Sequence, residues 1–183
     1  DIERQRQVLD DAANNLSHKG SPEWTTLRIG RRAADLATRL AGKWIEHDIY
    51  RKPKEHANDV ARSFAGSLRR DIRESSDPLA MAIRAATAGN IIDFGAKHHA
   101  TLDLKRECEA IGVQPFGNFD IAPFRKLVEG ANDLLYVCDN AGEIVFDILL
   151  MEVLRDLRPG LRILAAFRER PILNDATIED ARE

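Results

Sequence analysis

The chain has 183 residues, of which 44% are hydrophobic and 31% charged, and its formal net charge is −3. A chain of this length can bury a core large enough to fold without disulfides or a structural metal. The slightly acidic balance argues against a general nucleic-acid binder, which usually carries a basic excess. No apolar stretch approaches the roughly 20 residues that a membrane helix needs, so we expect no membrane partner. The first residues are charged with no apolar core after them, and the two cysteines form no CxxC pair, which together indicate a cytoplasmic protein.

The first part of the chain shows only helical patterns. Apolar residues recur there at the three- and four-residue spacing that marks one face of a helix. The predicted helices are one that ends near Gly20, a second over 27–45, a third over 56–74 and a fourth that starts after Asp77. Asp77 is a natural N-cap, and Pro78 fits the first helical position, where its missing N–H is not needed. No strand pattern precedes residue 110, so residues 1–110 are predicted to form a helical N-terminal region.

The pattern changes after residue 110. Residues 134–138 (Leu-Leu-Tyr-Val-Cys) are a short apolar run, typical of a strand buried on both faces, and residues 161–167 predict a second buried strand. A helix is predicted between them, over 143–157, and another is expected to start at 174–177. Strand, helix and strand at this spacing predict a βαβ unit, and therefore an α/β fold with a parallel sheet. Because the chain ends inside the last expected helix, we expect residues 111–183 to be the start of an α/β domain that continues in a longer protein.

Polar residues follow both predicted strands at the points where they end. Asp139 and Asn140 come directly after the first strand, and Asp175 lies shortly after the second. Ligands of open parallel sheets bind beyond the carboxyl ends of the strands, and two carboxylates with an amide oxygen suit Mg²⁺, Mn²⁺ or a similar ion. Gly142 and Glu143 open the next helix, whose free N–H groups and positive dipole end would face a phosphate. Gly142 would allow close approach, and Glu143 could orient a water or bind a substrate hydroxyl, so the sequence predicts chemistry on a phosphate with a bound metal.

These positions also have purely structural interpretations. Asp139 or Asn140 can cap the helix that follows, and Asp175 can cap the last predicted helix. Asp147 lies four residues after Glu143 on the same helical face, and we expect it to be solvated. The chain contains no glycine-rich dinucleotide loop, no P-loop, no nucleophile elbow and no HExxH motif. The residues alone therefore indicate a metal and a phosphate but name no reaction.

Residues 134–147 (Leu-Leu-Tyr-Val-Cys-Asp-Asn-Ala-Gly-Glu-Ile-Val-Phe-Asp) resemble the signature of the metal-dependent damage-control phosphatase family, also catalogued as domain of unknown function 89. Two further stretches match the same family in order: residues 77–94, with Gly-Asn-Ile-Ile-Asp-Phe at their end, and residues 171–181, which contain Asn-Asp-Ala-Thr. A weaker fourth match comprises Asp48, Tyr50, Lys54 and Asn58. The resemblance runs from about residue 45 to the end of the sequence.

This resemblance implies a helical N-terminal region packed on a Rossmann-like three-layer α/β/α domain. It also implies hydrolysis of phosphate monoesters of small metabolites, such as sugar phosphates or damaged or surplus cofactor intermediates, with Mn²⁺, Mg²⁺, Co²⁺ or Ni²⁺. Carried over to this sequence, the catalytic metal ligands would be Asp139, Asn140 and Asp175. The substrate-binding residues would be Glu143, Gly142, Asn90 and Asp93.

The chain departs from the family pattern in two respects. It lacks the CxxC that the archaeal and bacterial branch commonly carries near its N-terminus. It also ends before a Lys-Gly motif that helps bind phosphate in the family, so we expect the sheet to be incomplete. Two other functions remain open: an S-adenosylmethionine-dependent carboxyl methyltransferase, and a non-catalytic interaction module in which the acidic turn is structural.

Overall fold

The computed structural model describes residues 50–91 and 116–182, with isolated positions between residues 2 and 48, and without the side chains of Asn90 and Ile91. The helices predicted before residue 48 and the predicted boundary at residues 110–111 lie outside this part, and so does Asp93. The elements are, in chain order, α3 (Arg51–Glu74), α4 (Pro78–Ile91), α6 (Ile121–Gly130), β1 (Asp133–Val137), α7 (Glu143–Leu157) and β2 (Arg162–Ala166). No described helix is long and apolar enough to span a bilayer.

The third and fourth predicted helices form as α3 and α4, although α3 begins at Arg51, five residues before its predicted start. The buried positions of α3 recur every three or four residues and include Ala57, Ala61 and Ala65, which gives the helix one inward face. The fourth predicted helix starts as expected, because Asp77 caps α4: its Oδ1 accepts a hydrogen bond from the backbone N–H of Ala80 at 3.1 Å. The cap, the proline and the small apolar residues thus fix α4 locally, before any tertiary contact is considered.

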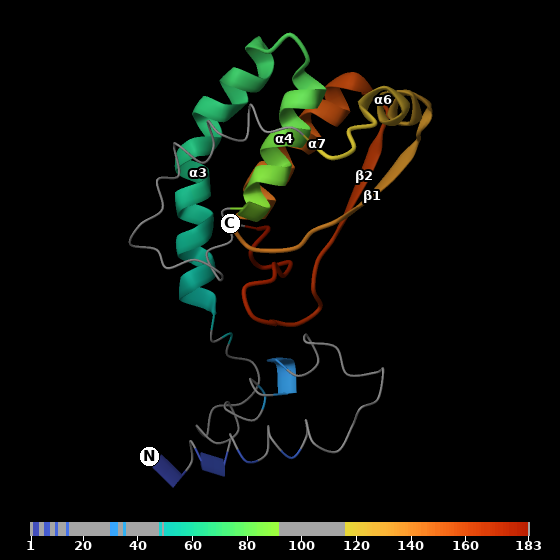
Figure 1. The fold of residues 1–183 in the computed structure, drawn as a ribbon. Helices are drawn as coiled ribbons and strands as arrows, with labels where there is room; N and C mark the ends of the chain where they lie inside the picture. The colour runs from blue at the N-terminus through green and yellow to red at the C-terminus, as the bar shows by residue number, and fades with distance from the viewer. Residues whose placement is uncertain are drawn as a thin grey trace.

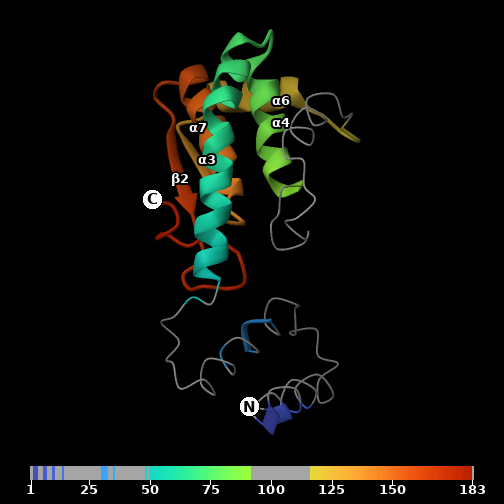
Figure 2. The same ribbon diagram turned by 90° about the vertical axis from the view of Figure 1, so that its left-hand side faces the viewer.

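The predicted βαβ unit is confirmed. Strands β1 and β2 are parallel and paired from Asp133↔Arg162 to Val137↔Ala166, with α7 as the crossover between them. Figure 1 shows α4 and α7 between α3 and the two strands, and the view turned by 90° in Figure 2 shows α3 running along α7. The fold is therefore a mixed α/β arrangement with a small parallel sheet, as the sequence predicts.

One face of the sheet packs on the helices and the other does not. Leu134 and Tyr136 contact a core built mainly from α4 and α7, whereas Leu135 and Val137 are 67% and 73% exposed. The prediction that this strand is buried on both faces is therefore wrong for the part of the chain that is described. Alternation along β1 makes the difference, because successive side chains of a strand point to opposite faces.

The segment after β2 also differs from the prediction. No helix starts at residues 174–177; instead Asp175 forms an antiparallel bridge with Asn140, and Arg168 forms a parallel bridge with Thr177. The residues that follow make turns up to Arg182. This segment packs against the loop after β1 and against α3, which places it beside the predicted site.

Candidate active site

Backbone hydrogen bonds bring the loop after β1 and the segment around Asp175 together. The N–H of Ala141 donates to the carbonyl of Asn174 at 2.9 Å, and the N–H of Ala176 donates to the carbonyl of Asp139 at 2.6 Å. Asn140 and Asp175 face each other in the bridge between these bonds. The convergence that the sequence predicts at the carboxyl ends of the two strands is thus present, although Asp175 reaches it from an extended segment.

Capping of the helices does not explain these polar residues. The N-cap of α7 is Gly142, which has no side chain with which to cap the helix, and neither Asp139 nor Asn140 occupies that position. Asp175 precedes turns, so it caps no helix either. Both capping interpretations are therefore wrong.

Gly142 is required by its backbone conformation and by its neighbours. Its φ is +87°, a region that residues with a side chain rarely adopt. A Cβ at this position would lie 3.2 Å from the Cβ of Ala57 on α3. The N–H of Gly142 donates to Oδ1 of the fully buried Asn58 at 2.7 Å, so α3 holds the turn in place.

The first turn of α7 is less open to a phosphate than the sequence predicts. The N–H of Gly142 is used by Asn58, that of Ile144 donates to the carbonyl of Asn140, and that of Val145 donates to the carbonyl of Gly142. These groups already have acceptors within the protein. The positive end of the helix dipole still faces the loop and still favours negative charge there.

Neighbouring side chains orient two of the candidate ligands. Asn140, which is 9% exposed, donates from Nδ2 to Oε1 of the buried Glu143 at 2.6 Å, and this turns its amide oxygen away from Glu143. The carboxylate of Asp175 accepts a hydrogen bond on Oδ2 from Nε of Arg168 at 2.6 Å. The sequence analysis did not identify Arg168. It lies just beyond the carboxyl end of β2, where ligands of open parallel sheets bind (the strand-end rule), so this rule could have identified it.

The candidate ligands fit a hard divalent cation in their chemistry. Asp139 is exposed at the loop, Asn140 contributes an amide oxygen, and Oδ1 of Asp175 is the oxygen that Arg168 does not bind. Within the described residues no group of three or more His, Cys, Asp or Glu side chains could hold a metal. A site here would therefore depend on the amide oxygen as well as the carboxylates, which suits oxygen-binding ions.

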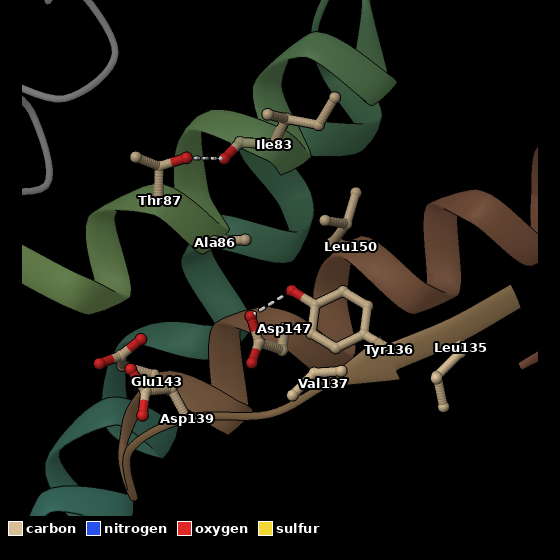
Figure 3. Close-up of a pocket in the computed structure, with 10 residues that line it drawn as sticks. All are labelled: Ile83, Ala86, Thr87, Leu135, Tyr136, Val137, Asp139, Glu143, Asp147 and Leu150. Atoms are coloured by element: carbon tan, nitrogen blue, oxygen red, sulfur yellow. Dashed lines mark hydrogen bonds between the residues drawn. The ribbon is translucent and has the colours of Figure 1, made fainter. Parts of the chain in front are cut away.

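A pocket of about 690 Å³ opens beside Asp139 and Glu143. Figure 3 shows these two side chains at one end, with Tyr136 and Asp147 farther along the wall. The apolar walls come from α4, β1 and α7 and comprise Ile83, Ala86, Leu135, Val137 and Leu150. The pocket therefore joins the candidate metal ligands to a mostly apolar cavity that contains a second polar pair.

The expectation that Asp147 is solvated is wrong. Asp147 is 7% exposed, and its Oδ1 accepts a hydrogen bond from the hydroxyl of Tyr136 at 2.5 Å. Burial raises the pKa of Asp147 to about 6; the hydrogen bond from Tyr136 opposes this rise, and the negative charge of Asp139 adds to it. Burial and then the charge of Asp147 raise the pKa of Tyr136, which keeps that hydroxyl protonated.

Lys54 connects the start of α3 to the segment after Asp175. Its Nζ, on a side chain 2% exposed, lies 2.6 Å from Oδ2 of Asp48 and 2.7 Å from Oδ2 of Asp180. Burial lowers the pKa of Lys54, but the bonds to the two carboxylates outweigh it and the net pKa is raised. Asp180 also accepts hydrogen bonds from the N–H and the hydroxyl of Thr177, so the weaker sequence match at Asp48, Lys54 and Asn58 marks residues that support the site.

The structure describes two of the predicted substrate-binding residues, Asn90 and Asp93, only in part or not at all. The backbone of Asn90 lies in the last turn of α4, its side chain lies outside the described part, and all of Asp93 does too. Gly89 packs tightly on the start of α7, since a Cβ there would lie 3.2 Å from Cα of Glu143. The end of α4 therefore reaches the candidate site.

The comparisons with known proteins match the resemblance found in the sequence. The family model described as the damage-control phosphatase ARMT1-like domain matches residues 2–183. A damage-control phosphatase of Archaeoglobus fulgidus is 35% identical over 160 residues, which cover 81% of this chain and 52% of that protein. A damage-control phosphatase of Pyrococcus horikoshii is 30% identical, and the match covers 96% of this chain and 67% of that protein.

A solved structure shows the same fold. The crystal structure of a DUF89 family protein from Pyrococcus horikoshii superposes with a TM-score of 0.81 at 26% identity, and the match covers all of this chain and 61% of that one. The chain spans about half the length of the Archaeoglobus fulgidus relative and 45% of an uncharacterised Methanocaldococcus jannaschii protein that is 36% identical. With the family model matching nearly every residue, the chain belongs to the damage-control phosphatase ARMT1-like family.

Proposed function

We propose that this protein is a phosphatase that hydrolyses phosphate monoesters of small metabolites with the help of a bound divalent cation, Mn²⁺, Mg²⁺, Co²⁺ or Ni²⁺. The observation that carries the proposal is the pairing of two backbone segments, the loop after β1 and the segment around Asp175. Their hydrogen bonds bring Asp139, Asn140 and Asp175 together at the carboxyl ends of β1 and β2. Its relatives named damage-control phosphatases support the class of reaction. The two lone cysteines support a cytoplasmic location.

In this proposal the three candidate ligands hold the ion through oxygen atoms. A divalent cation at this place polarises a phosphoryl oxygen and offsets the charge that develops on it. Glu143 keeps the amide oxygen of Asn140 available by binding its nitrogen, and Arg168 holds the carboxylate of Asp175 in one orientation. Fixed ligands need no rearrangement when substrate arrives, which is the usual way in which such sites lower a barrier.

Other residues contribute shape and contacts to the substrate. Gly142, by lacking a side chain, allows α3 and the loop that carries the candidate ligands to pack closely. Glu143 lines the pocket beside Asp139 and would contact the substrate. Asn90 and Asp93 would also bind substrate, as the resemblance to the family implies.

The test measures phosphate release from p-nitrophenyl phosphate and a panel of phosphorylated metabolites, with each of the four metals and with chelator. The variant is Asp139→Asn, and the matched control is Asp133→Asn, which removes an exposed carboxylate at the opposite end of β1. We expect metal-dependent turnover by the unaltered protein and the control, and a loss of about 100-fold or more in Asp139→Asn, since a catalytic metal contributes several kcal/mol.

Other results would refute the proposal. Absence of turnover with every metal, together with unchanged metal affinity in Asp139→Asn, would make the loop a structural turn. Binding of S-adenosylmethionine with transfer of its methyl group to a carboxyl group would instead establish the methyltransferase reaction.

A further inference from the structure

The pocket beside the candidate metal ligands contains a polar pair that the proposed reaction does not use. Asp147 lies four residues after Glu143 on α7, which places it about 6 Å farther along the helix axis on the same face. Figure 3 shows Asp147 between Tyr136, to which one of its oxygens is hydrogen-bonded, and the end of the pocket that contains Asp139 and Glu143. A phosphate held at the ligand end would therefore direct the organic part of the ester toward this pair.

Asp147 has an unused acceptor. Its Oδ1 is bound by the hydroxyl of Tyr136, and among the described residues nothing donates to its second oxygen. Asp147 is only 7% exposed, and it lines the pocket. A carboxylate oxygen that meets the pocket and has no donor within the protein can accept a hydrogen bond from a ligand that carries one.

The remaining walls restrict what that donor can belong to. No Lys, Arg or His is among the described residues that line the pocket, whereas three carboxylates do so. The hydroxyl of Thr87 already donates to the carbonyl of Ile83 at 2.9 Å. Away from the proposed metal, a second anionic group on the substrate would thus meet the negative charge of the described lining residues, while a hydroxyl or an ammonium group would find acceptors.

We propose that Asp147, positioned by Tyr136, binds a hydrogen-bond donor on the organic part of the phosphate ester and selects against esters that carry a second anion there. This inference rests on the proposed phosphatase function and names the substrate class of the same site. Asp147 is the residue that contacts substrate, and Tyr136 is a positioning residue that acts by holding the carboxylate.

The test uses four phosphate esters of similar size that differ at one end: propyl phosphate, hydroxypropyl phosphate, aminopropyl phosphate and carboxyethyl phosphate. Initial rates give kcat and KM for each, in the full chain with the most active metal, near pH 7.5, where a carboxyl group with a pKa of about 6 is ionised. The variants are Asp147→Asn and Tyr136→Phe. The control is Asp156→Asn, the same replacement at an exposed position of α7.

The unaltered protein and the control should prefer the hydroxyl or amino ester over propyl phosphate by about tenfold in kcat/KM and should disfavour the carboxyl ester, as expected for a hydrogen bond to a charged group. In Asp147→Asn the preference for the donor-bearing ester should fall about tenfold, and the discrimination against the carboxyl ester should weaken, because the amide can donate to it. In Tyr136→Phe the preference for the donor-bearing esters over propyl phosphate should fall about threefold, mainly because KM for the donor-bearing esters rises. The relative rates of the hydroxyl and amino esters identify the donor.

Failure of the proposed phosphatase function and failure of this inference alone give different results. If the unaltered protein releases no phosphate from these esters or from p-nitrophenyl phosphate with any metal, the proposed function and this inference are both overturned. If it hydrolyses them and both variants, shown to be folded by circular dichroism, keep the same preferences as the control, only this inference is overturned.

Discussion

Replacing Asp147 by Asn should stabilise the metal-free protein near neutral pH. The pKa of this carboxyl group rises from an ordinary value of 3.8 to about 6 on folding, because the side chain is buried between β1 and α7. Each unit of pKa corresponds to about 1.4 kcal/mol, so the ionised group makes the folded state less stable by about 3 kcal/mol at pH 7. Asn carries no charge and keeps an oxygen that can accept the hydrogen bond from Tyr136.

The sign of the pH dependence follows from which state binds the proton more tightly. A raised folded pKa means that the folded state holds the proton of Asp147 between about pH 4 and 6, while the unfolded state has lost it. The stability that this proton contributes is present at low pH and is lost as the pH rises through 6. The advantage of Asp147→Asn over the unaltered protein should therefore be largest, up to about 3 kcal/mol, near pH 7 and should nearly vanish near pH 4.

Urea unfolding followed by circular dichroism, in chelator at both pH values, measures this difference. Subtracting the unaltered protein at each pH cancels the other titrating groups. Asp156→Asn, at an exposed position on the same helix, should stay within about 0.5 kcal/mol at both pH values. The reasoning would be refuted if Asp147→Asn lowered the free energy of unfolding equally near pH 4 and pH 7, because the carboxyl group would then carry no buried charge.

Two further substitutions test how the loop after β1 is held. Gly142→Ala should lower the free energy of unfolding by about 1 to 3 kcal/mol in urea unfolding, because φ of +87° disfavours a side chain and the added Cβ would lie 3.2 Å from Ala57; an unchanged value would mean that the turn adapts freely. Lys54→Met should cost about 3 to 5 kcal/mol near pH 7, because it leaves the carboxylates of Asp48 and Asp180 without their cation. Since the pKa of Asp180 is lowered in the folded state, this cost should shrink as the pH falls below about 4, and a cost that grew instead would contradict the ion-pair account.

The elements that the sequence predicted well are those set by neighbouring residues. Asp77 caps α4 through a bond to a residue three positions away, and the strands β1 and β2 differ from the predicted runs by one residue at their ends. The strand-end rule placed Asp139, Asn140 and Asp175 together because parallel strands joined by one helix have few alternatives.

The predictions that were wrong concern burial and partners. The spacing of Glu143 and Asp147 shows that they share a helical face, but not that this face meets β1, where Tyr136 binds Asp147. The composition around Asp175 favours a helix start, yet pairing with Asn140 offers this segment backbone partners that a helix would not supply. Local propensity is a weak preference, and tertiary contacts override it.

By itself the sequence determined α3, α4, the parallel βαβ unit and the loop in which the candidate ligands lie, because caps, turns and apolar periodicity act over a few residues. Only the tertiary structure decided that Lys54 pairs with Asp180, 126 positions away, and that Arg168 and Glu143 hold the side chains of Asp175 and Asn140. The tertiary structure also decided which carboxyl groups are buried, and therefore which of them have a pKa that differs from its ordinary value. Burial and charge pairing depend on the whole packed chain, and no local pattern of residues encodes them.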